Sequence, residues 1–402
     1  MFRVSYFLKE LESPGSQRPP GIPPGPVVIW NLLRRCNLAC KHCYATSADV
    51  DFAGELSTPE IMAVLDDLKA FRVPALILSG GEPLMHPDIE PISRRAVQLG
   101  FYTALSSNGT LIDDANVRTL ADIGFHYLGI SVDGIGGTHD RFRRMTGAFD
   151  RSMRALELCK QYGIKTGLRF TLTQDNAAEF DDVLRLMDEY DVDKFYLSHL
   201  NYAGRGDRNR KDDVFHQTTR HAIERLFDKA QADIRAGRPR EYTTGNNDAD
   251  GVFMYLWARE RFPDRAEHLR QRLEAWGGNA TGLYIGNIDN LGNVHPDSFW
   301  WDYTLGNVRE RPFSAIWSDR SDPLFGGLAQ RPRPVEGRCG ACPFLKVCGG
   351  NTRVRAYRLT GNPWAEDPAC YLDNETLGIA SDAPRLANSP YRRASRAIES
   401  ST

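Results

Sequence analysis

The sequence predicts an α/β protein, a partial (β/α)6 TIM-like barrel followed by a smaller α+β domain. Six short apolar runs alternate with segments of helical periodicity between residues 27 and 200, and this alternation does not continue into the C-terminal third. Strands that are apolar throughout and separated by helices belong to a parallel sheet covered on both faces. A complete barrel has eight such units, so six predict an open barrel with its site at the C-terminal strand ends.

Four segments are expected along the chain: an extended N-terminal arm (1–25), a core barrel (26–240), a C-terminal domain (241–380) and a mobile tail (381–402). The arm is expected because ESPGSQRPPGIPPGP is rich in Pro and Gly, which favour neither a helix nor a sheet. The tail is expected because SDAPRLANSPYRRASRAIESST is polar and rich in turn formers.

The first expected strand, VVIWNLL, leads directly into a cysteine-rich loop. The next segment, STPEIMAVLDDLKAF, has a capping Ser57 or Thr58 and an early proline, so it predicts a helix. The remaining expected strands are ALILSG, YTALSS, YLGISVD, TGLRFTL and KFYLSHL. The helices expected between them are DIEPISRRAVQLG, DDANVRTLADIG, FDRSMRALELCKQYG and AAEFDDVLRLMDEY.

The C-terminal third predicts a charged helix and a hairpin. RFPDRAEHLRQRLEAWGG has helical character and ends in glycines, and GLYIGNIDNLGNVHPDS predicts a hairpin with its turn at Asn290 to Asn293.

Composition limits the functional classes. The chain has 402 residues, a net charge of −2 and 41% hydrophobic residues, enough for substantial cores. Acids and bases are intermixed, so no nucleic-acid surface is expected. No apolar run approaches the roughly 20 residues of a membrane helix, and no signal peptide is evident. We therefore expect a cytoplasmic protein that does not bind a membrane.

Three cysteines, Cys36, Cys40 and Cys43, lie within eight positions in RRCNLACKHCYATS. Tight grouping and an odd number argue against disulfides. A structural zinc takes four ligands, and the nearby candidate, His42, is poorly placed beside Cys43. In an iron–sulfur cube held by three thiolates, one iron keeps an open position for another ligand. The pattern therefore favours a reactive cluster.

The second group consists of Cys339, Cys342, Cys348 and Cys370. Four thiolates close a cluster completely, and a CxxC pair with two further cysteines also suits zinc, so the spacing favours neither metal. Cys159 belongs to neither group and is expected to be a buried structural thiol on an amphipathic helix.

Polar residues recur where the expected strands end. They are Ser79-Gly-Gly-Glu-Pro83, Ser107-Asn-Gly-Thr110, Ser131-Val-Asp-Gly134, Arg169, and the group His199, Asn201 and Tyr202. Each is weak alone, because Gly-rich pairs usually form turns. Their recurrence at successive strand ends, near the three-cysteine loop, predicts one common site.

CNLACKHC followed by GGEP resembles the radical S-adenosylmethionine (SAM) enzymes from about residue 27 to 200. The resemblance implies a [4Fe–4S] cluster on Cys36, Cys40 and Cys43, whose open iron binds SAM. It implies these further SAM contacts: His42 near the adenine, Gly80, Gly81 and Glu82 at the amino group, Asn108, Ser131 and Asp133 at the ribose, and Arg169 at the carboxylate. The implied chemistry is reductive cleavage of SAM to a 5′-deoxyadenosyl radical. For Arg169, a buried structural role is a competing interpretation.

CGACPFLKVCGG with a late cysteine resembles the SPASM extension of these enzymes. The resemblance implies an auxiliary [4Fe–4S] cluster on Cys339, Cys342, Cys348 and Cys370. A second, inner auxiliary cluster is not expected, because Thr352 and Asp297 stand where the family has cysteines. The expected cofactors are thus two [4Fe–4S] clusters and SAM.

Longer stretches, including GPVVIWNLLRRCNLACKHCY and VDGIGGTHDRFRRMTGAFD, resemble the radical SAM enzymes of heme d1 biosynthesis. This implies removal of propionate side chains from the tetrapyrrole didecarboxysiroheme, with a low-potential donor such as flavodoxin or ferredoxin. Two alternatives stay open: a radical SAM enzyme acting on another substrate such as a peptide, and a non-catalytic iron–sulfur or zinc protein.

Several side chains are candidates for contact with a tetrapyrrole. Arginines suit its carboxylates, tryptophans suit its ring, and histidine or tyrosine suits its iron or a proton. The candidates are Arg141, Arg143, Arg144, Arg205, Arg208, Arg210, Trp300, Trp301, His199, Tyr202 and His295. For each of them a purely structural role is an equal or stronger alternative.

Overall fold

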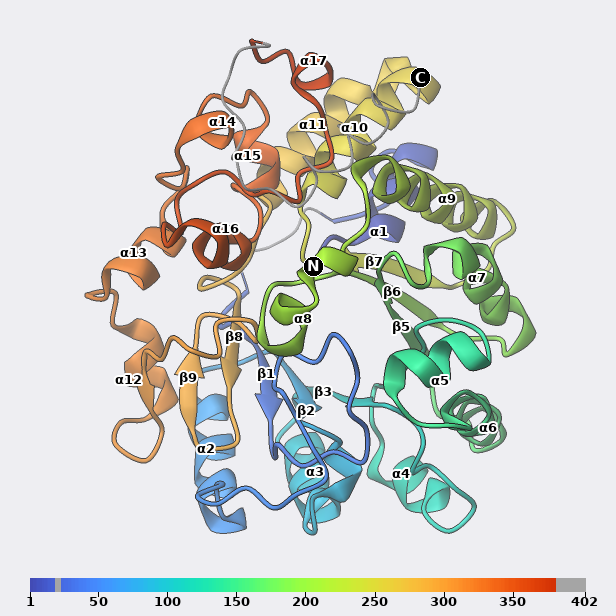
Figure 1. Ribbon diagram of the computed structural model, residues 1–402, viewed down its shortest axis with the longest axis vertical. Coiled ribbons are helices and arrows are strands. Elements are labelled where there is room, and N and C mark those ends of the chain that lie inside the picture. Colours follow the sequence, from blue (N-terminus) through green and yellow to red (C-terminus); the bar gives the residue numbers. More distant parts are fainter. Residues whose placement is uncertain (19–22, 381–402) are drawn as a thin grey trace.

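The computed structural model describes residues 1–18 and 23–380, so the tail expected at 381–402 lies outside the described residues. Its centre is one ten-stranded sheet in the order β10-β9-β8-β1-β2-β3-β4-β5-β6-β7 (Figure 1). Its strands are β1 (Val27–Asn31), β2 (Ala75–Ser79), β3 (Tyr102–Ser107), β4 (Tyr127–Ser131), β5 (Thr166–Leu172), β6 (Lys194–His199), β7 (Glu241–Gly245), β8 (Ile285–Ile288), β9 (Asn293–His295) and β10 (Gly306–Asn307). Every neighbouring pair from β8 to β7 is parallel, and β9 and β10 are antiparallel to their neighbours.

The expected fold class is confirmed, with the six predicted strands present as β1 to β6. Helices follow these strands and cover the outer face of the curved sheet (Figure 1). In the barrel half they are α2 (Thr58–Ala70), α3 (Ile89–Gln98), α4 (Val117–Ile123), α5 (Gly137–Arg143), α6 (Ala148–Gln161), α7 (Phe180–Glu189), α8 (Gly204–Arg208) and α9 (His216–Arg235). Ser57 is the N-cap of α2, and its backbone N–H donates to Glu60 Oε2 at 2.7 Å.

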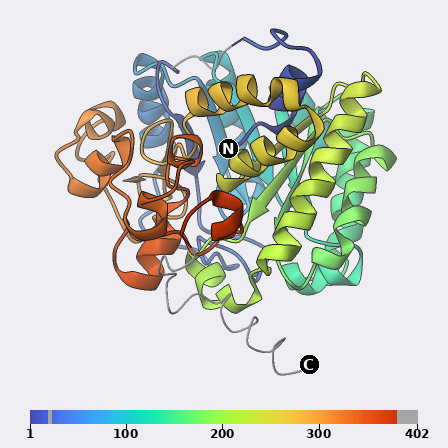
Figure 2. The same ribbon diagram turned by 90° about the horizontal axis from the view of Figure 1, so that it is seen from above.

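The C-terminal part contains helices and a hairpin that continue the barrel sheet. Its helices are α10 (Ala249–Arg261), α11 (Pro263–Trp276), α12 (Phe313–Ser318), α13 (Pro323–Ala329), α14 (Gly337–Gly340), α15 (Leu345–Cys348), α16 (Arg353–Thr360) and α17 (Asn374–Leu377). The predicted charged helix is α11, and the predicted hairpin is β8–β9, which adds to β1. Figure 2 shows the orange elements of this part and most of the green helices on opposite sides of the molecule, with the yellow helices α10 and α11 between them.

Strand β7 was not predicted, because EYTTG contains little apolar character. It extends the sheet beside β6, and α1 (Val4–Glu12) packs against it. Packing against α1 thus stabilises a strand that the local sequence does not favour.

The prediction of an extended arm is wrong for residues 4–12, which form α1. Val4, Phe7, Leu8 and Leu11 recur at helical spacing and are buried. Phe2, just before the helix, exchanges two backbone hydrogen bonds with Thr244 of β7, at 2.7 and 2.8 Å. The prolines that suggested an arm lie beyond this helix, so its start is part of the core.

No helix within residues 1–18 and 23–380 has the length and hydropathy needed to cross a lipid bilayer.

Candidate active site

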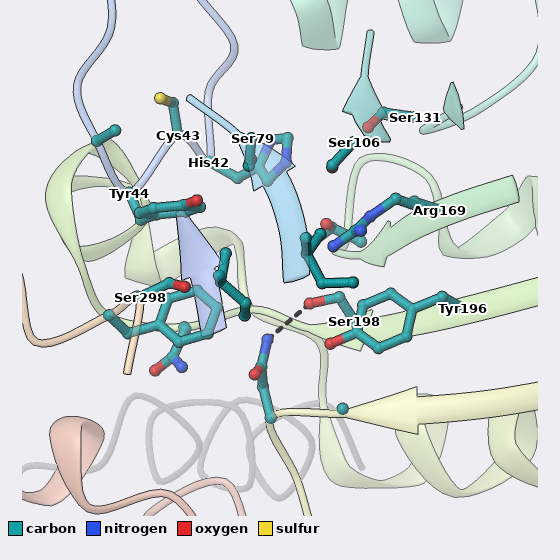
Figure 3. Close-up of a pocket in the computed structure, with 18 of the residues that line it drawn as sticks. His42, Cys43, Tyr44, Ser79, Ser106, Ser131, Arg169, Tyr196, Ser198 and Ser298 are labelled. Atoms are coloured by element: carbon teal, nitrogen blue, oxygen red, sulfur yellow. Dashed lines mark hydrogen bonds between the residues drawn. The ribbon is translucent and has the colours of Figure 1, made fainter. Parts of the chain in front are cut away.

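A cavity of about 240 Å³ lies where the parallel strands end at their C-termini (Figure 3). It is lined by the three-cysteine loop, by the ends of β2 to β6 and by residues of the C-terminal part. Most of the predicted site residues of the barrel line it: Cys36, Cys40, Cys43, His42, Gly80, Gly81, Asn108, Ser131 and Arg169. Glu82 and Asp133 are not part of its wall.

Arg205 of α8 binds the backbone of the three-cysteine loop through two hydrogen bonds. Its Nε donates to the carbonyl of Cys40 at 2.7 Å, and its Nη1 donates to the carbonyl of Ser47 at 2.9 Å. Inside the loop, the N–H of Leu38 points at Cys36 Sγ at 3.4 Å. Backbone donors to sulfur are the usual environment of an iron–sulfur ligand.

Gly80 and Gly81 are required by the approach of the β2 loop to the three-cysteine loop. A Cβ on Gly81 would lie 2.1 Å from the carbonyl oxygen of Arg35, and one on Gly80 would lie 2.7 Å from that of Leu33. The Gly81 N–H donates to the Leu33 carbonyl at 2.7 Å. Hydrogen bonding between the two loops thus explains both glycines and leaves their backbone on the cavity wall.

Glu82 is fully buried and turned toward β3. Its Oε1 accepts from Ser107 Oγ at 2.8 Å and from the Leu84 N–H at 3.2 Å, and its Oε2 accepts from the Asn108 N–H at 2.8 Å. Burial raises the pKa of Glu82 to about 7, although these three donors lower it. Its carboxyl group ties the end of β2 to the end of β3, and the SAM contact expected of Glu82 stays a prediction.

Asp133 forms a buried ion pair with Arg143 instead of facing the cavity. Arg143 Nη2 donates to Asp133 Oδ2, and the Thr171 N–H donates to Oδ1 at 2.6 Å. Arg143 Nη1 lies 3.6 Å from Cys40 Sγ. His42 lies 3.9 Å from the same carboxylate oxygen and packs on Phe142, and burial lowers the pKa of His42 to about 4. The ribose contact expected of Asp133 does not match this placement.

Arg169 points into the cavity beside Tyr196 (Figure 3). Its guanidinium lies 5.1 Å from the centre of the Tyr196 ring, a cation–π geometry. Ser131 lines the same region, and Asn108 Nδ2 donates to Asn37 Oδ1 at 2.9 Å near Cys36. Polar groups at this edge suit a polar ligand.

Tyr44 and Tyr196 are wall residues that the sequence interpretation did not select. Tyr44 follows Cys43 directly, accepts from Asn31 Nδ2 at 2.9 Å and packs edge-on against Phe299 at 5.3 Å (Figure 3). Tyr196 and Ser198 lie on one face of β6, both toward the cavity. Alternate residues of a strand point to the same face, so the alternation of apolar and polar residues in KFYLSH could have identified Tyr196 and Ser198 as neighbours on one face.

The predicted tetrapyrrole candidates are mostly structural. His295 contacts the Tyr303 carbonyl at 2.8 Å and Asp289 at 3.3 Å, and Trp301 stacks on it. Trp300 is buried in a small apolar cluster, and the Tyr202 hydroxyl donates to Asp213 at 3.0 Å. Arg141, Arg144 and Arg208 are exposed, and Arg210 pairs with Asp207 at 3.5 Å. Of the five His, Tyr and Trp candidates, His199 alone lines the cavity, and its buried partner is Asp250.

The second cysteine group gathers around α14, α15 and the segment before α17. Burial raises the pKa of the Cys348 thiol well above its usual range, and the charges of Cys339, Cys342 and Cys370 raise it further, which shows that the four thiols are close. Arg338 lies against Cys370.

The positions where an inner cluster would need cysteines are occupied by a hydrogen-bonded polar group. The Thr281 hydroxyl donates to Asp297, and Asn279 Nδ2 lies 3.4 Å from Thr352 Oγ1. Asn279 also binds Arg333, whose Nη1 donates to Asn279 Oδ1 at 2.8 Å. These side chains bind one another and line the cavity without offering a thiolate.

Neither cysteine group of the described residues has the geometry of a site for one metal ion. Within the described residues, no three His, Cys, Asp or Glu side chains converge on a point that one metal ion could occupy. In a cluster each thiolate binds a different iron, so the sulfurs stay apart. Burial raises the pKa of Cys36 to about 12 and that of Cys339 to about 11, so both thiols are protonated at neutral pH unless a bound metal deprotonates them.

Comparisons with known proteins agree with this geometry. The family described as the radical SAM superfamily matches residues 30–187. A protein of Dinoroseobacter shibae named pre-heme d1 synthase is 51% identical over 97% of this chain and 97% of its own length. This chain belongs to the radical SAM superfamily. Fe-coproporphyrin III synthase of Methanosarcina barkeri is 42% identical over 88% of this chain and 89% of its own length.

Membership in the radical SAM superfamily makes this chain an enzyme with a [4Fe–4S] cluster and SAM as cofactors. The crystal structure of Streptococcus suis SuiB bound to its precursor peptide SuiA has a TM-score of 0.69 at 18% identity, over 87% of this chain and 76% of SuiB. That likeness supports the fold, a radical SAM barrel with a SPASM-like C-terminal part.

Proposed function

We propose that this radical SAM enzyme removes propionate side chains from didecarboxysiroheme in heme d1 biosynthesis. The observation that supports this substrate most strongly is the 51% identity, over 97% of both chains, to a pre-heme d1 synthase. The second relative, an Fe-coproporphyrin III synthase, is also named for an iron tetrapyrrole.

For the SAM site, we propose that Cys36, Cys40 and Cys43 hold the cluster. His42, Gly80, Gly81, Asn108, Ser131 and Arg169 line the adjoining cavity and are the proposed SAM contacts. When bound, the cluster and SAM supply the 5′-deoxyadenosyl radical that takes a hydrogen atom from the substrate. The cavity walls hold the target C–H group close and exclude water and other hydrogen donors.

Among the arginines of the cavity wall, Arg169 is the proposed partner of the SAM carboxylate, because its guanidinium faces the cavity beside Tyr196. Arg143 and Arg205 are engaged with the cysteine loop and are assigned to it instead. Tyr44, with Phe299 behind it, offers a flat aromatic wall on which a macrocycle can stack.

A second [4Fe–4S] cluster is proposed on Cys339, Cys342, Cys348 and Cys370. Its support is the grouping of these four half-buried cysteines around α14, α15 and the segment before α17. Electrons for the SAM cluster are proposed to come from a low-potential donor such as flavodoxin or ferredoxin.

The test is anaerobic. The reconstituted enzyme is mixed with dithionite and SAM, with and without didecarboxysiroheme, and both 5′-deoxyadenosine and the tetrapyrrole mass are quantified. We expect 5′-deoxyadenosine together with loss of propionate mass, and neither product from Cys36→Ala. Cleavage of SAM with an unchanged tetrapyrrole would refute the substrate while retaining the radical chemistry.

A further inference from the structure

The loop that contains the three barrel cysteines reaches the surface between two helices. In Figure 1 this blue loop, which follows β1, lies between α8 and α5. The Lys41 N–H donates to the carbonyl of Phe142 in α5 at 3.0 Å, and Asn209, just after α8, donates through Nδ2 to the Lys41 carbonyl at 2.8 Å. Lys41, the neighbour of Cys40 in the chain, is therefore part of a surface to which both helices contribute.

The cysteines lie directly beneath this surface. Cys40 is 7% exposed, and Met145, which is half-buried, packs against the apolar group that includes Cys36 and Cys40. Arg143 Nη1 lies 3.6 Å from Cys40 Sγ, and the next residue, Arg144, is exposed. A protein that docks here comes within about one layer of side chains of the proposed cluster ligands.

The side chains around Lys41 that reach solvent are mostly basic, and we call them the basic surface. Its members are Lys41, then Arg141 and Arg144 at the end of α5, and Arg208, Arg210 and Lys211 in and just after α8. The same segments hold four acids, Asp140, Asp175, Asp207 and Asp212, so six basic and four acidic residues give this surface a net charge of +2. The whole chain has a net charge of −2, so the basic surface is a local excess of positive charge.

Three members of the basic surface have no acidic partner. Lys41 pairs with Asp175 at 2.6 Å. Within residues 1–18 and 23–380, by contrast, Arg144, Arg208 and Lys211 form no ion pair, and all three are exposed. Their charges are therefore available to an anionic group from outside the chain.

We propose that the basic surface is the docking site of the acidic protein that reduces the SAM-binding cluster. The inference rests on the proposed function, because it needs that cluster on Cys36, Cys40 and Cys43 and a protein as the donor. With a flavodoxin as donor, one electron leaves the anionic flavin hydroquinone, which becomes the neutral semiquinone. The same electron converts the oxidised [4Fe–4S]²⁺ cluster to the reduced [4Fe–4S]⁺ state, so no other reactant is consumed.

The kind of partner follows from the charge and from the position of this surface. Electron-transfer proteins form small, transient interfaces, and attraction between opposite charges steers their encounter. Exposed arginine and lysine side chains mainly raise the rate of association with an acidic partner. The basic surface lies over the three-cysteine loop, which selects an electron carrier over other acidic molecules.

The first experiment measures reduction of the SAM-binding cluster without any tetrapyrrole. The reconstituted enzyme is mixed anaerobically with flavodoxin hydroquinone, and freeze-quench EPR follows the cluster signal that changes when SAM is added. Wild type is compared with Arg144→Glu, Arg208→Glu and the double variant. We expect the double variant to be reduced about tenfold more slowly at low salt. Near 1 M salt, where the screening length falls to about 3 Å, the difference should shrink to less than about twofold.

Two controls separate docking from damage to the cluster. Dithionite is a small molecule that needs no docking site, so it should reduce the cluster to the same extent in every variant. Lys69→Glu makes the same change of charge at the other end of the barrel. Lys69 is exposed in the last turn of α2, and a Cβ on Gly100, two residues before β3, would lie 3.6 Å from its Nζ. We expect wild-type reduction by flavodoxin in this variant.

The second experiment locates the contact. A carbodiimide couples carboxylates of bound flavodoxin to lysines that touch them, and mass spectrometry of the peptides identifies those lysines. We expect a cross-link to Lys211 at low salt, its loss at high salt, and none to Lys69.

The outcomes distinguish this inference from the proposed function. Equal rates with flavodoxin in wild type and the double variant at low salt would overturn the docking site, as would a cross-link to Lys69 in place of Lys211. A wild-type enzyme that dithionite reduces and flavodoxin does not would also overturn it, and would leave the SAM-binding cluster intact. A wild-type enzyme without any cluster that dithionite reduces would refute the proposed cluster and the docking site together.

Discussion

Arg143 Nη1 lies 3.6 Å from Cys40 Sγ, inside the wall of the SAM-binding site. The same guanidinium donates to Asp133, so the arginine is fixed by an ion pair on one side and a cysteine ligand on the other. A fixed positive charge beside a thiolate stabilises the more negative, reduced state of a cluster. Arg143 therefore favours reduction of the cluster that cleaves SAM.

Arg143→Gln is expected to lower the midpoint potential of the SAM-binding cluster. Loss of the charge should shift the reduction equilibrium about tenfold, about 59 mV for one electron. Arg143→Lys keeps the charge and should shift the potential less. Redox titration followed by EPR measures both. Because Asp133 is left unpaired in Arg143→Gln, the double variant with Asp133→Asn is the control for its negative charge. An unchanged midpoint potential in Arg143→Gln and in the double variant would refute an effect of Arg143 on the cluster.

Local pattern and motif spacing were sufficient for β1 to β6 and for the cysteine loop, because apolar runs and clustered ligands are properties of short segments. The placement of Glu82 and Asp133 was not predictable in this way. Their partners, Ser107 and Arg143, lie on other strands or helices and turn both carboxylates away from the cavity. The apolar residues of α1 have helical spacing, but the prolines that follow them favoured the prediction of an extended arm.

Gly81→Ala is expected to destabilise the enzyme and disturb cluster binding. The added Cβ would lie 2.1 Å from the Arg35 carbonyl oxygen, a backbone atom that cannot move without displacing Cys36. We expect a loss of about 3 kcal/mol in the free energy of unfolding and reduced iron content. Gly137→Ala is the control, because its Cβ meets the flexible end of Arg141 at 3.3 Å. Equal stability of the two variants would contradict the role given to Gly81.

Phe7→Ala tests whether α1, at the N-terminus, is part of the folded core. Phe7 is 1% exposed and packs on Phe2, with ring centroids 5.1 Å apart, and on Trp276 of α11 at 6.2 Å. Truncation of a buried phenylalanine costs about 3–5 kcal/mol, so urea unfolding should show a large loss of stability. Tyr162→Ala, at an exposed position, should change stability by less than about 0.5 kcal/mol. A dispensable extended arm would instead make Phe7→Ala nearly neutral.

Glu82→Gln is expected to change how stability depends on pH. Burial raises the pKa of Glu82 to about 7 in the folded protein, from 4.5 when the group is exposed. Between these values the folded state binds more protons than the unfolded state, so this group makes stability fall as pH rises. The variant should lose that part of the slope in anaerobic urea unfolding between pH 5 and 8.

Glu60→Gln is the control of opposite sign. The Arg309 guanidinium and the Ser57 cap lower the pKa of Glu60 to about 2, so its contribution is lost as pH falls below 4.5. Between pH 5 and 8 the difference between wild type and Glu60→Gln should be constant. A slope that is the same in wild type and Glu82→Gln would show that Glu82 is ionised throughout this range.

Iron analysis tests the number of clusters. At the place of an inner auxiliary cluster, the cavity wall consists of Asn279, Thr281, Asp297 and Thr352, which bind one another and offer no thiolate. Two [4Fe–4S] clusters correspond to about eight irons per chain. Replacing the three cysteines of the barrel loop by alanine, or the four C-terminal cysteines, should each leave about four irons.

The outcomes separate three arrangements. About twelve irons in the wild-type enzyme would mean that an inner cluster forms without cysteine ligands, contrary to the polar group around Asn279. About four would mean that the C-terminal cysteines hold none. Asp297→Cys alone should not raise the iron content, because a single added thiolate does not hold a cluster. The Asp297→Cys and Thr352→Cys pair supplies two thiolates on the cavity wall. A gain of iron in the pair, and not in the single variant, would show that missing thiolates, rather than missing space, exclude the third cluster.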